Sequence, residues 1–87
     1  MVSKKVILRN LTGLHLRPAG LLCNEAVKYA AAITCKKGES SFNAKSVLSV
    51  LGACIRRDDE IEIVADGVDE EEALAAIVTL IESGLGE

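Results

Sequence analysis

The only histidine of the chain lies in a short segment that also carries an arginine and a proline. The segment reads Gly13-Leu14-His15-Leu16-Arg17-Pro18-Ala19 and stands where a β-like run gives way to a helical pattern. The start of a helix offers unpaired backbone N–H groups and the positive end of the helix dipole, which together attract anions. An imidazole nitrogen beside such a site can attack phosphorus, so the chemistry that this segment predicts is phosphoryl transfer.

We expect His15 to be the N-cap residue and the nucleophile, because the positive end of the dipole disfavours the imidazolium form. Arg17 can bind phosphate oxygens through its guanidinium, and the backbone amides of Leu16 and Arg17 can donate to the same oxygens. Pro18 is compatible with a first helical turn. The residue types leave a plainer interpretation open, in which His15 is an ordinary cap and Arg17 a solvated side chain.

Other chemistries find less support. No carboxylate is recognisably paired with His15, and no Cys or Asp lies at metal-ligand spacing from it, which disfavours a hydrolase or a metal site. The three cysteines, Cys23, Cys35 and Cys54, form no C-x-x-C pair, so we expect free thiols and a cytoplasmic protein. A net charge of −3 and an aromatic content of 2% disfavour nucleic acid as a partner. No apolar run predicts export or membrane insertion.

The 87 residues predict one domain, residues 1–87, whose elements must position this segment. Hydrophobic periodicity predicts strands over 2–9, 32–36, 40–43 and 60–65 and helices over 16–30, 47–53 and from 69 to a stop at Gly84. This βαββαβα order predicts an α+β fold, an open sandwich with its helices on one face of a four-stranded sheet.

Finer expectations follow from the same patterns. Residues 10–13 should form a turn. In the fourth strand Ile61, Ile63 and Ala65 should face inward and Glu60, Glu62 and Val64 outward. Asp69 and Glu72 have the spacing of a capping box at the start of the last helix.

A candidate docking surface lies beside the phosphate site. Val47, Leu48 and Leu51 crowd one short helix, and Leu16, Gly20 and Val27 form a second stripe outside the core face of the first helix. An exposed apolar patch between them, with Lys45 and Arg17 at its rim, would suit a partner protein. The alternative is that several of these residues belong to the core. Ser46 should cap the short helix.

Two motifs resemble the HPr family, the histidine-containing phosphocarriers of the sugar phosphotransferase system. Residues 13–19 look like the family's active-site signature, and Asn43-Ala44-Lys45-Ser46-Val47-Leu48 looks like its regulatory serine motif. The ending Glu82-Ser83-Gly84-Leu85-Gly86-Glu87 resembles the tail of Gram-positive members. The similarity runs along the whole chain and implies an open-faced β-sandwich with an antiparallel sheet.

The resemblance also implies a function in sugar transport. Enzyme I, charged by phosphoenolpyruvate, would phosphorylate His15 at Nδ1, and IIA domains of sugar permeases would receive the group, with Arg17 stabilising the phosphate. HPr kinase/phosphorylase would phosphorylate Ser46 and connect the chain to a catabolite-control transcription regulator and carbon catabolite repression. The implied protein is a carrier rather than a stand-alone enzyme, and it needs neither a cofactor nor a metal. A monomer would suit a shuttle that must visit several partners.

Two residues depart from the family pattern. Leu16 stands where a small Ala is usual, which could alter the choice of partner, and Cys54 stands where Gly is common. Two other classes of function remain open. One is a regulatory binding module governed by Ser46, although such a module would not need His15 and Arg17. The other is a metal-handling or ligand-sensing domain, which the missing C-x-x-C disfavours for metals.

Overall fold

A computed structural model describes residues 1–10 and 13–86 of the chain. The elements follow in the predicted order: β1 Val2–Ile7, α1 Leu16–Ala26, β2 Ala32–Lys37, β3 Ser40–Asn43, α2 Val47–Gly52, β4 Glu60–Asp66 and α3 Glu70–Glu82. Each observed strand and helix falls on its predicted segment, with ends that differ by a few residues. Part of the turn predicted over 10–13 lies outside the described residues.

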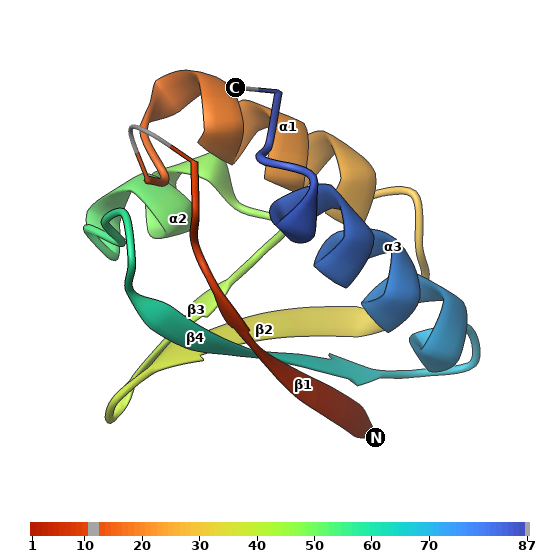
Figure 1. Cartoon of the computed structure of the whole chain (residues 1–87). Helices are drawn as coiled ribbons and strands as arrows, with labels where there is room; N and C mark the ends of the chain where they lie inside the picture. Colours follow the sequence, from red (N-terminus) through yellow and green to blue (C-terminus); the bar gives the residue numbers. More distant parts are fainter. Residues whose placement is uncertain (11–12, 87) are drawn as a thin grey trace.

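The four strands form one antiparallel sheet in the order β1-β4-β2-β3. In its central register Ile63 of β4 pairs with Lys4 of β1 on one side and with Cys35 of β2 on the other. All three helices cover the same face of this sheet (Figure 1). The predicted α+β fold, an open-faced β-sandwich, is confirmed.

The core lies between the sheet and the helices. Ile61, Ile63 and Ala65 of β4 are buried there, as the alternation predicts. Val64 was expected on the solvent side but is only 9% exposed. It lies in a central strand, where Ser3 and Thr34 are its cross-strand neighbours, and these neighbours cover much of its surface.

The first helix is shorter than predicted. α1 ends at Ala26 rather than near residue 30, and the next amides tighten into i→i−3 bonds, from Lys28 to Glu25 and from Tyr29 to Ala26. The amides of Ala30 and Ala31 then donate to the carboxylate of Asp69 at 2.9 and 2.8 Å. Because these two amides bond to Asp69 rather than to helical carbonyls, the helix cannot continue through them. The predicted helix was too long because the apolar periodicity of the sequence extends past Ala26.

The predicted capping box at the start of α3 is wrong. Asp69 is the N-cap residue but makes no side-chain cap bond, because its carboxylate is occupied by Ala30 and Ala31. Glu70 instead reaches back to the amide of Gly67 at 3.2 Å. The end of the helix is as predicted, since Gly84 follows the last turn with a φ of +95°, which glycine adopts without strain.

Candidate functional site

The side chain of His15 is exposed at the start of α1. His15 is the N-cap residue, with extended backbone angles (φ −78°, ψ −175°) and no side-chain cap bond. Its carbonyl accepts from the amide of Ala19 at 2.8 Å, which closes the first helical turn. The imidazole therefore lies beside the helix terminus but forms no hydrogen bond to its backbone amides. The interpretation of His15 as an ordinary side-chain cap is not supported.

The first turn of α1 has the features of an anion site. The amides of Leu16 and Arg17 donate to no group among residues 1–10 and 13–86, and Pro18 has no N–H at all. The first turn carries no acidic residue, so no carboxylate of its own neutralises the positive end of the dipole. Two amide donors are thus available to a phosphoryl group on the neighbouring imidazole.

Arg17 adds a cation to this turn. Its side chain is exposed and makes no ion pair with any described residue. A guanidinium can form two parallel hydrogen bonds to phosphate oxygens. His15, Arg17 and the two amides all lie on this first turn, and their joint binding of phosphate stays a prediction.

The segment that leads into α1 is held against the loop after α2. Leu14 donates its amide to the carbonyl of Ile55 at 3.0 Å. Gly13 has a φ of +65°, and a Cβ there would lie 2.7 Å from the Ile55 carbonyl oxygen and 2.8 Å from Cα of Arg56. Only glycine fits such a close backbone approach at positive φ. Asn10, only 3% exposed, donates its side-chain amide to the Gly13 carbonyl at 2.6 Å.

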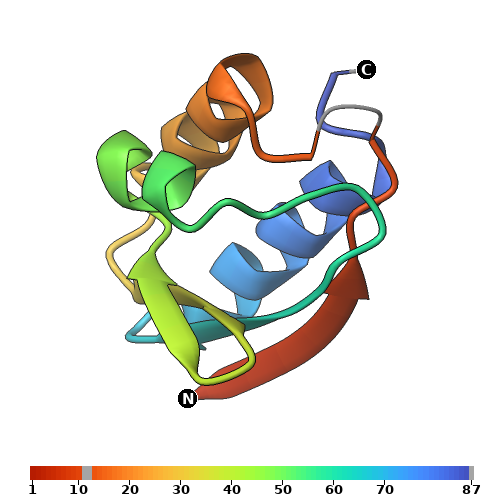
Figure 2. The same cartoon turned by 90° about the vertical axis from the view of Figure 1, so that its left-hand side faces the viewer.

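Sequence reasoning missed this support. Asn10 was read as part of a turn, and Ile55 and Arg56 were assigned no role. Figure 2 shows the loop between α2 and β4 crossing beneath the segment that leads into α1. The one signal in the sequence was Gly13, since a glycine two residues before a helix cap often marks a left-handed or crowded backbone.

Ser46 caps α2 as predicted. Its hydroxyl accepts from the amide of Ser49 at 3.3 Å, and its carbonyl accepts from Val50 at 3.0 Å. The preceding Lys45 donates from Nζ to the carbonyl of Tyr29 at 2.6 Å. Lys45 therefore ties the start of α2 to the chain beyond α1.

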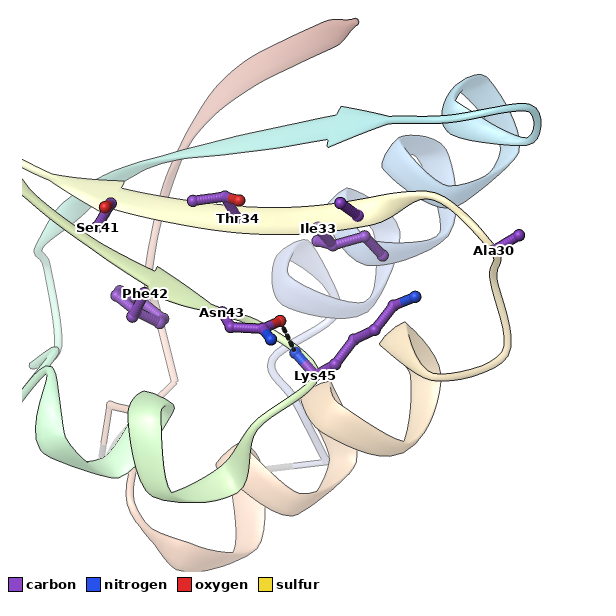
Figure 3. A pocket seen from close by; sticks show the side chains of 8 residues that line it. Ala30, Ile33, Thr34, Ser41, Phe42, Asn43 and Lys45 are labelled. Carbon is purple, nitrogen blue, oxygen red and sulfur yellow. Dashed lines mark hydrogen bonds between the residues drawn. The ribbon is translucent and has the colours of Figure 1, made fainter.

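A shallow pocket of about 510 Å³ lies along β2 and β3 next to Lys45. Figure 3 shows Phe42 and Asn43 of β3 near it, with Asn43 accepting from the backbone amide of Lys45. Lys45 is the only charged residue of its lining, and Nζ of that lysine is already used by Tyr29. No residue of the first turn of α1 borders this pocket, so it is separate from the candidate site at His15.

The six residues of the predicted docking surface divide into two groups. Leu48 and Leu16 are 81% and 71% exposed, and Val27 is exposed as well. Gly20 is half-buried, and a Cβ there would meet nothing within 4 Å. Val47 and Leu51 are half-buried and pack against the core. The apolar surface available to a partner therefore consists mainly of side chains from α1 and α2, next to Arg17.

The cysteines are free thiols, as predicted. Cys23 and Cys35 are buried, and burial raises the pKa of Cys35 to about 12. Cys54 is exposed and has a φ of +55°, the left-handed conformation that favours the glycine expected there. In the described part of the chain no cluster of His, Cys, Asp or Glu could hold a metal ion, and no helix there is long and apolar enough to cross a membrane.

Comparisons with known proteins bear on this geometry. Residues 2–83 match the family model described as the PTS HPr component phosphorylation site. The phosphocarrier protein HPr of Mycoplasma capricolum is 38% identical over 86 residues, which cover 98% of this chain and 97% of that protein. The HPr-like protein Crh of Halalkalibacterium halodurans is 35% identical over 82 residues, 94% of this chain and 98% of that protein.

Solved structures agree. The crystal structure of HPr-C-His from Thermoanaerobacter tengcongensis has a TM-score of 0.97 at 38% identity and covers 100% of this chain and 98% of its own. The crystal structure of an HPr dimer from the same organism has a TM-score of 0.80 at 38% identity and covers 100% of both chains. With sequence, fold and the matched phosphorylation-site model in agreement, the chain belongs to the HPr family of phosphocarrier proteins of the phosphotransferase system.

Proposed function

We propose that this protein carries a phosphoryl group on His15, which it accepts from phosphorylated enzyme I and passes to IIA domains of sugar permeases. The observation that carries the proposal is the open start of α1. An exposed imidazole, an unpaired guanidinium and two unbonded amides lie within three consecutive residues, His15, Leu16 and Arg17. The phosphoryl group would come originally from phosphoenolpyruvate.

The transfer step follows from these groups. The neutral imidazole of His15, at Nδ1 in this family, attacks phosphorus with its lone pair, and the bond between phosphorus and its donor atom on enzyme I breaks. The electron pair of that bond stays with the donor. The charge on the phosphoryl oxygens is stabilised by Arg17 and by the amides of Leu16 and Arg17. Transfer to a IIA domain reverses these roles, so the chain is regenerated in every cycle and is no stand-alone enzyme.

We also propose that Ser46 is a regulatory site for HPr kinase/phosphorylase, linked to a catabolite-control transcription regulator. The supporting observation is its position at the start of α2, beside the exposed Leu48. A phosphoserine there would add about two negative charges to the docking surface. An acidic partner such as enzyme I would then be repelled, and transfer through His15 would slow.

A regulatory binding module is the second candidate, favoured by the similarity to the HPr-like protein Crh. In that case docking controlled by Ser46 would be the main activity and His15 would be used rarely. The presence of both His15 and Arg17 on an unobstructed first turn favours the carrier. A carrier that visits several partners is best served by a cytoplasmic monomer, although a relative has been solved as a dimer.

Intact mass spectrometry after incubation with phosphoenolpyruvate and enzyme I tests the carrier. We expect an acid-labile gain of one phosphoryl group in the wild type and none in His15→Ala. The exposed His15 side chain makes no cap bond, so the variant should unfold at the wild-type denaturant concentration. An unmodified wild type with an active enzyme I would refute the relay, and labelling of Ser46 by ATP and the kinase would then favour the regulatory module.

A further inference from the structure

Asn10 is a polar residue in an otherwise apolar interior. Among residues 1–10 and 13–86 it is the only polar residue that is buried. A buried side-chain amide costs free energy unless hydrogen bonds satisfy it. Asn10 precedes His15 by five positions in the sequence and is not among the groups that carry the transfer step above. Its bond to Gly13 connects this buried amide to the candidate site.

The peptide unit between Gly13 and Leu14 is bonded at both of its polar groups. Its carbonyl accepts from Nδ2 of Asn10 at 2.6 Å, and its N–H donates to the carbonyl of Ile55 at 3.0 Å. A trans peptide unit is planar and directs these two groups to opposite sides, so the two bonds fix its orientation. The amide of Gly13 also donates to the carbonyl of Asn10 at 3.3 Å, and the side chain of Leu14 is buried in the core.

His15 follows directly after this fixed peptide unit. Its own carbonyl accepts from the amide of Ala19 at 2.8 Å, so the backbone is bonded on both sides of the histidine. The backbone angles at His15 set the direction of its Cα–Cβ bond, and the imidazole makes no side-chain cap bond that would hold the ring. Asn10 can therefore act on the position of the ring through the backbone of residues 13 and 14.

We propose that Asn10 is a positioning residue, whose bond to the Gly13 carbonyl holds the imidazole of His15 in line with the phosphoryl group of a docked donor protein. This inference rests on the proposed carrier function. Phosphoryl transfer depends on the alignment of the attacking and leaving atoms, and a displacement of about 1 Å can cost about 10²-fold in rate. Asn10 is buried and touches no partner, so its loss should slow the transfer within the complex and leave docking unchanged.

Rapid-quench labelling of His15 at varied concentrations of phosphorylated enzyme I tests the proposal. It measures the saturating rate constant of transfer and the enzyme I concentration at half saturation. We expect Asn10→Ala to lower the saturating rate constant about ten- to hundredfold and to change the half-saturating concentration by less than about twofold. Asn10→Asp keeps the shape of the side chain, but its ionised form has no N–H to donate, so it should be slowed in the same way.

Two controls separate positioning from a loss of stability and from a loss of reactivity. Ile77→Val leaves a small cavity in the core beneath α3; it should lower the urea midpoint and keep the wild-type rate constant. Phosphoramidate is a small phosphoryl donor that can approach the ring from any direction. It should label His15 of both Asn10 variants at a rate within about twofold of the wild type. All rates are measured under conditions in which urea unfolding shows every variant to be folded.

A wild-type rate constant in either Asn10 variant, an equal loss in Ile77→Val, or a change confined to the half-saturating concentration would overturn the positioning role. Equal slowing with phosphoramidate would overturn it too, because the imidazole itself would then be less reactive. Wild-type protein that active enzyme I does not label would refute the carrier function and this inference with it. Normal labelling of the wild type and of both Asn10 variants would refute this inference only.

Discussion

Two helices of this protein begin in opposite electrostatic surroundings. α3 starts with Asp69 followed by three glutamates in its first turn, and two of these carboxylates, those of Asp69 and Glu70, have partners within the protein. Glu70 lies 2.8 Å from the N-terminal amine, and Asp69 accepts from Ala30 and Ala31. α1 starts with His15, which makes no cap bond, and has no acidic residue in its first turn.

The difference separates a helix start whose carboxylates bond within the protein from one whose backbone donors are left without partners among the described residues. Carboxylates near the positive end of the dipole stabilise a helix by about 0.3–1 kcal/mol each. The carboxylates at the start of α3 provide that stabilisation. Asp69 also connects α3 to the chain beyond α1, because it accepts hydrogen bonds from Ala30 and Ala31. α1 has no acidic residue in its first turn and lacks this stabilisation. Its first amides and Arg17 are therefore not occupied by a carboxylate of the same turn. Adding a carboxylate to the first turn of α1 should therefore change the rate of phosphorylation. Removing the carboxylate charge of Asp69 at the start of α3 should change the stability of the fold.

Arg17→Glu gives α1 the kind of start that α3 has. We expect phosphorylation of His15 to slow by roughly 10²–10³-fold, because a cation is lost and a carboxylate competes with phosphate for the amides. Stability should be unchanged or rise by up to about 1 kcal/mol, since an acidic residue in the first turn suits the dipole. Rapid-quench labelling and urea unfolding measure the two effects. Arg17→Gln, which adds no carboxylate, should lose less rate, and a fully active Arg17→Glu would contradict the assignment.

Gly13→Ala tests the close packing of the segment that leads into α1 against the loop after α2. The new Cβ would approach the Ile55 carbonyl to 2.7 Å at a φ of +65°. We expect a loss of about 2–4 kcal/mol in the free energy of unfolding, from left-handed strain and backbone overlap together. Urea unfolding measures it. Gly20→Ala is the matched control, because its Cβ meets nothing and should stabilise the helix by about 0.5–1 kcal/mol. Equal effects of the two changes would argue against the close packing of residue 13.

Asp69→Asn removes the negative charge of the carboxylate at the start of α3. Hydrogen bonds from Ala30 and then Ala31 hold the pKa of Asp69 below its ordinary value. The ionised form therefore stabilises the fold above the unfolded-state pKa of about 3.9, and this contribution disappears as the pH falls through the folded-state pKa. We expect a lower urea midpoint for Asp69→Asn at pH 7, with the difference from wild type shrinking below pH 4. The exposed Glu71→Gln should shift the midpoint less, and a pH-independent difference would contradict this account.

Cys54→Gly changes the loop after α2, which packs against the segment leading into α1. We expect this substitution to have the smallest effect on stability. The φ of +55° at Cys54 strains a residue with a Cβ, but glycine gains entropy in the unfolded chain, so we expect a net stabilisation of about 0.5–1 kcal/mol. Thermal unfolding under reducing conditions measures it. Ala53 has a right-handed φ of −73°, and Ala53→Gly should destabilise by a similar amount. A loss of stability in Cys54→Gly would mean that the thiol contributes contacts.

Much of the site could be predicted from the sequence because its parts are adjacent. His15, Leu16 and Arg17 are consecutive, and the change from alternating to helical periodicity beside them indicates a helix start. Ser46 was predicted as a cap for the same local reason. The capping box at Asp69 and Glu72 had equally good spacing and was wrong, because spacing does not reveal that other amides compete for the same carboxylate.

By itself, the sequence determined the order of the elements, the face of β4 that carries Ile61 and Ile63, and the groups at the start of α1. Each of these follows from periodicity or from residues within one helical turn. Only the tertiary structure decided where α1 ends, what Asp69 binds and which loop supports Gly13. Asp69 and Ala31 are 38 positions apart, and Ile55 is 41 positions from Leu14. Such pairs form because the whole fold brings them together and buries polar groups that must be bonded, a constraint that no local pattern contains.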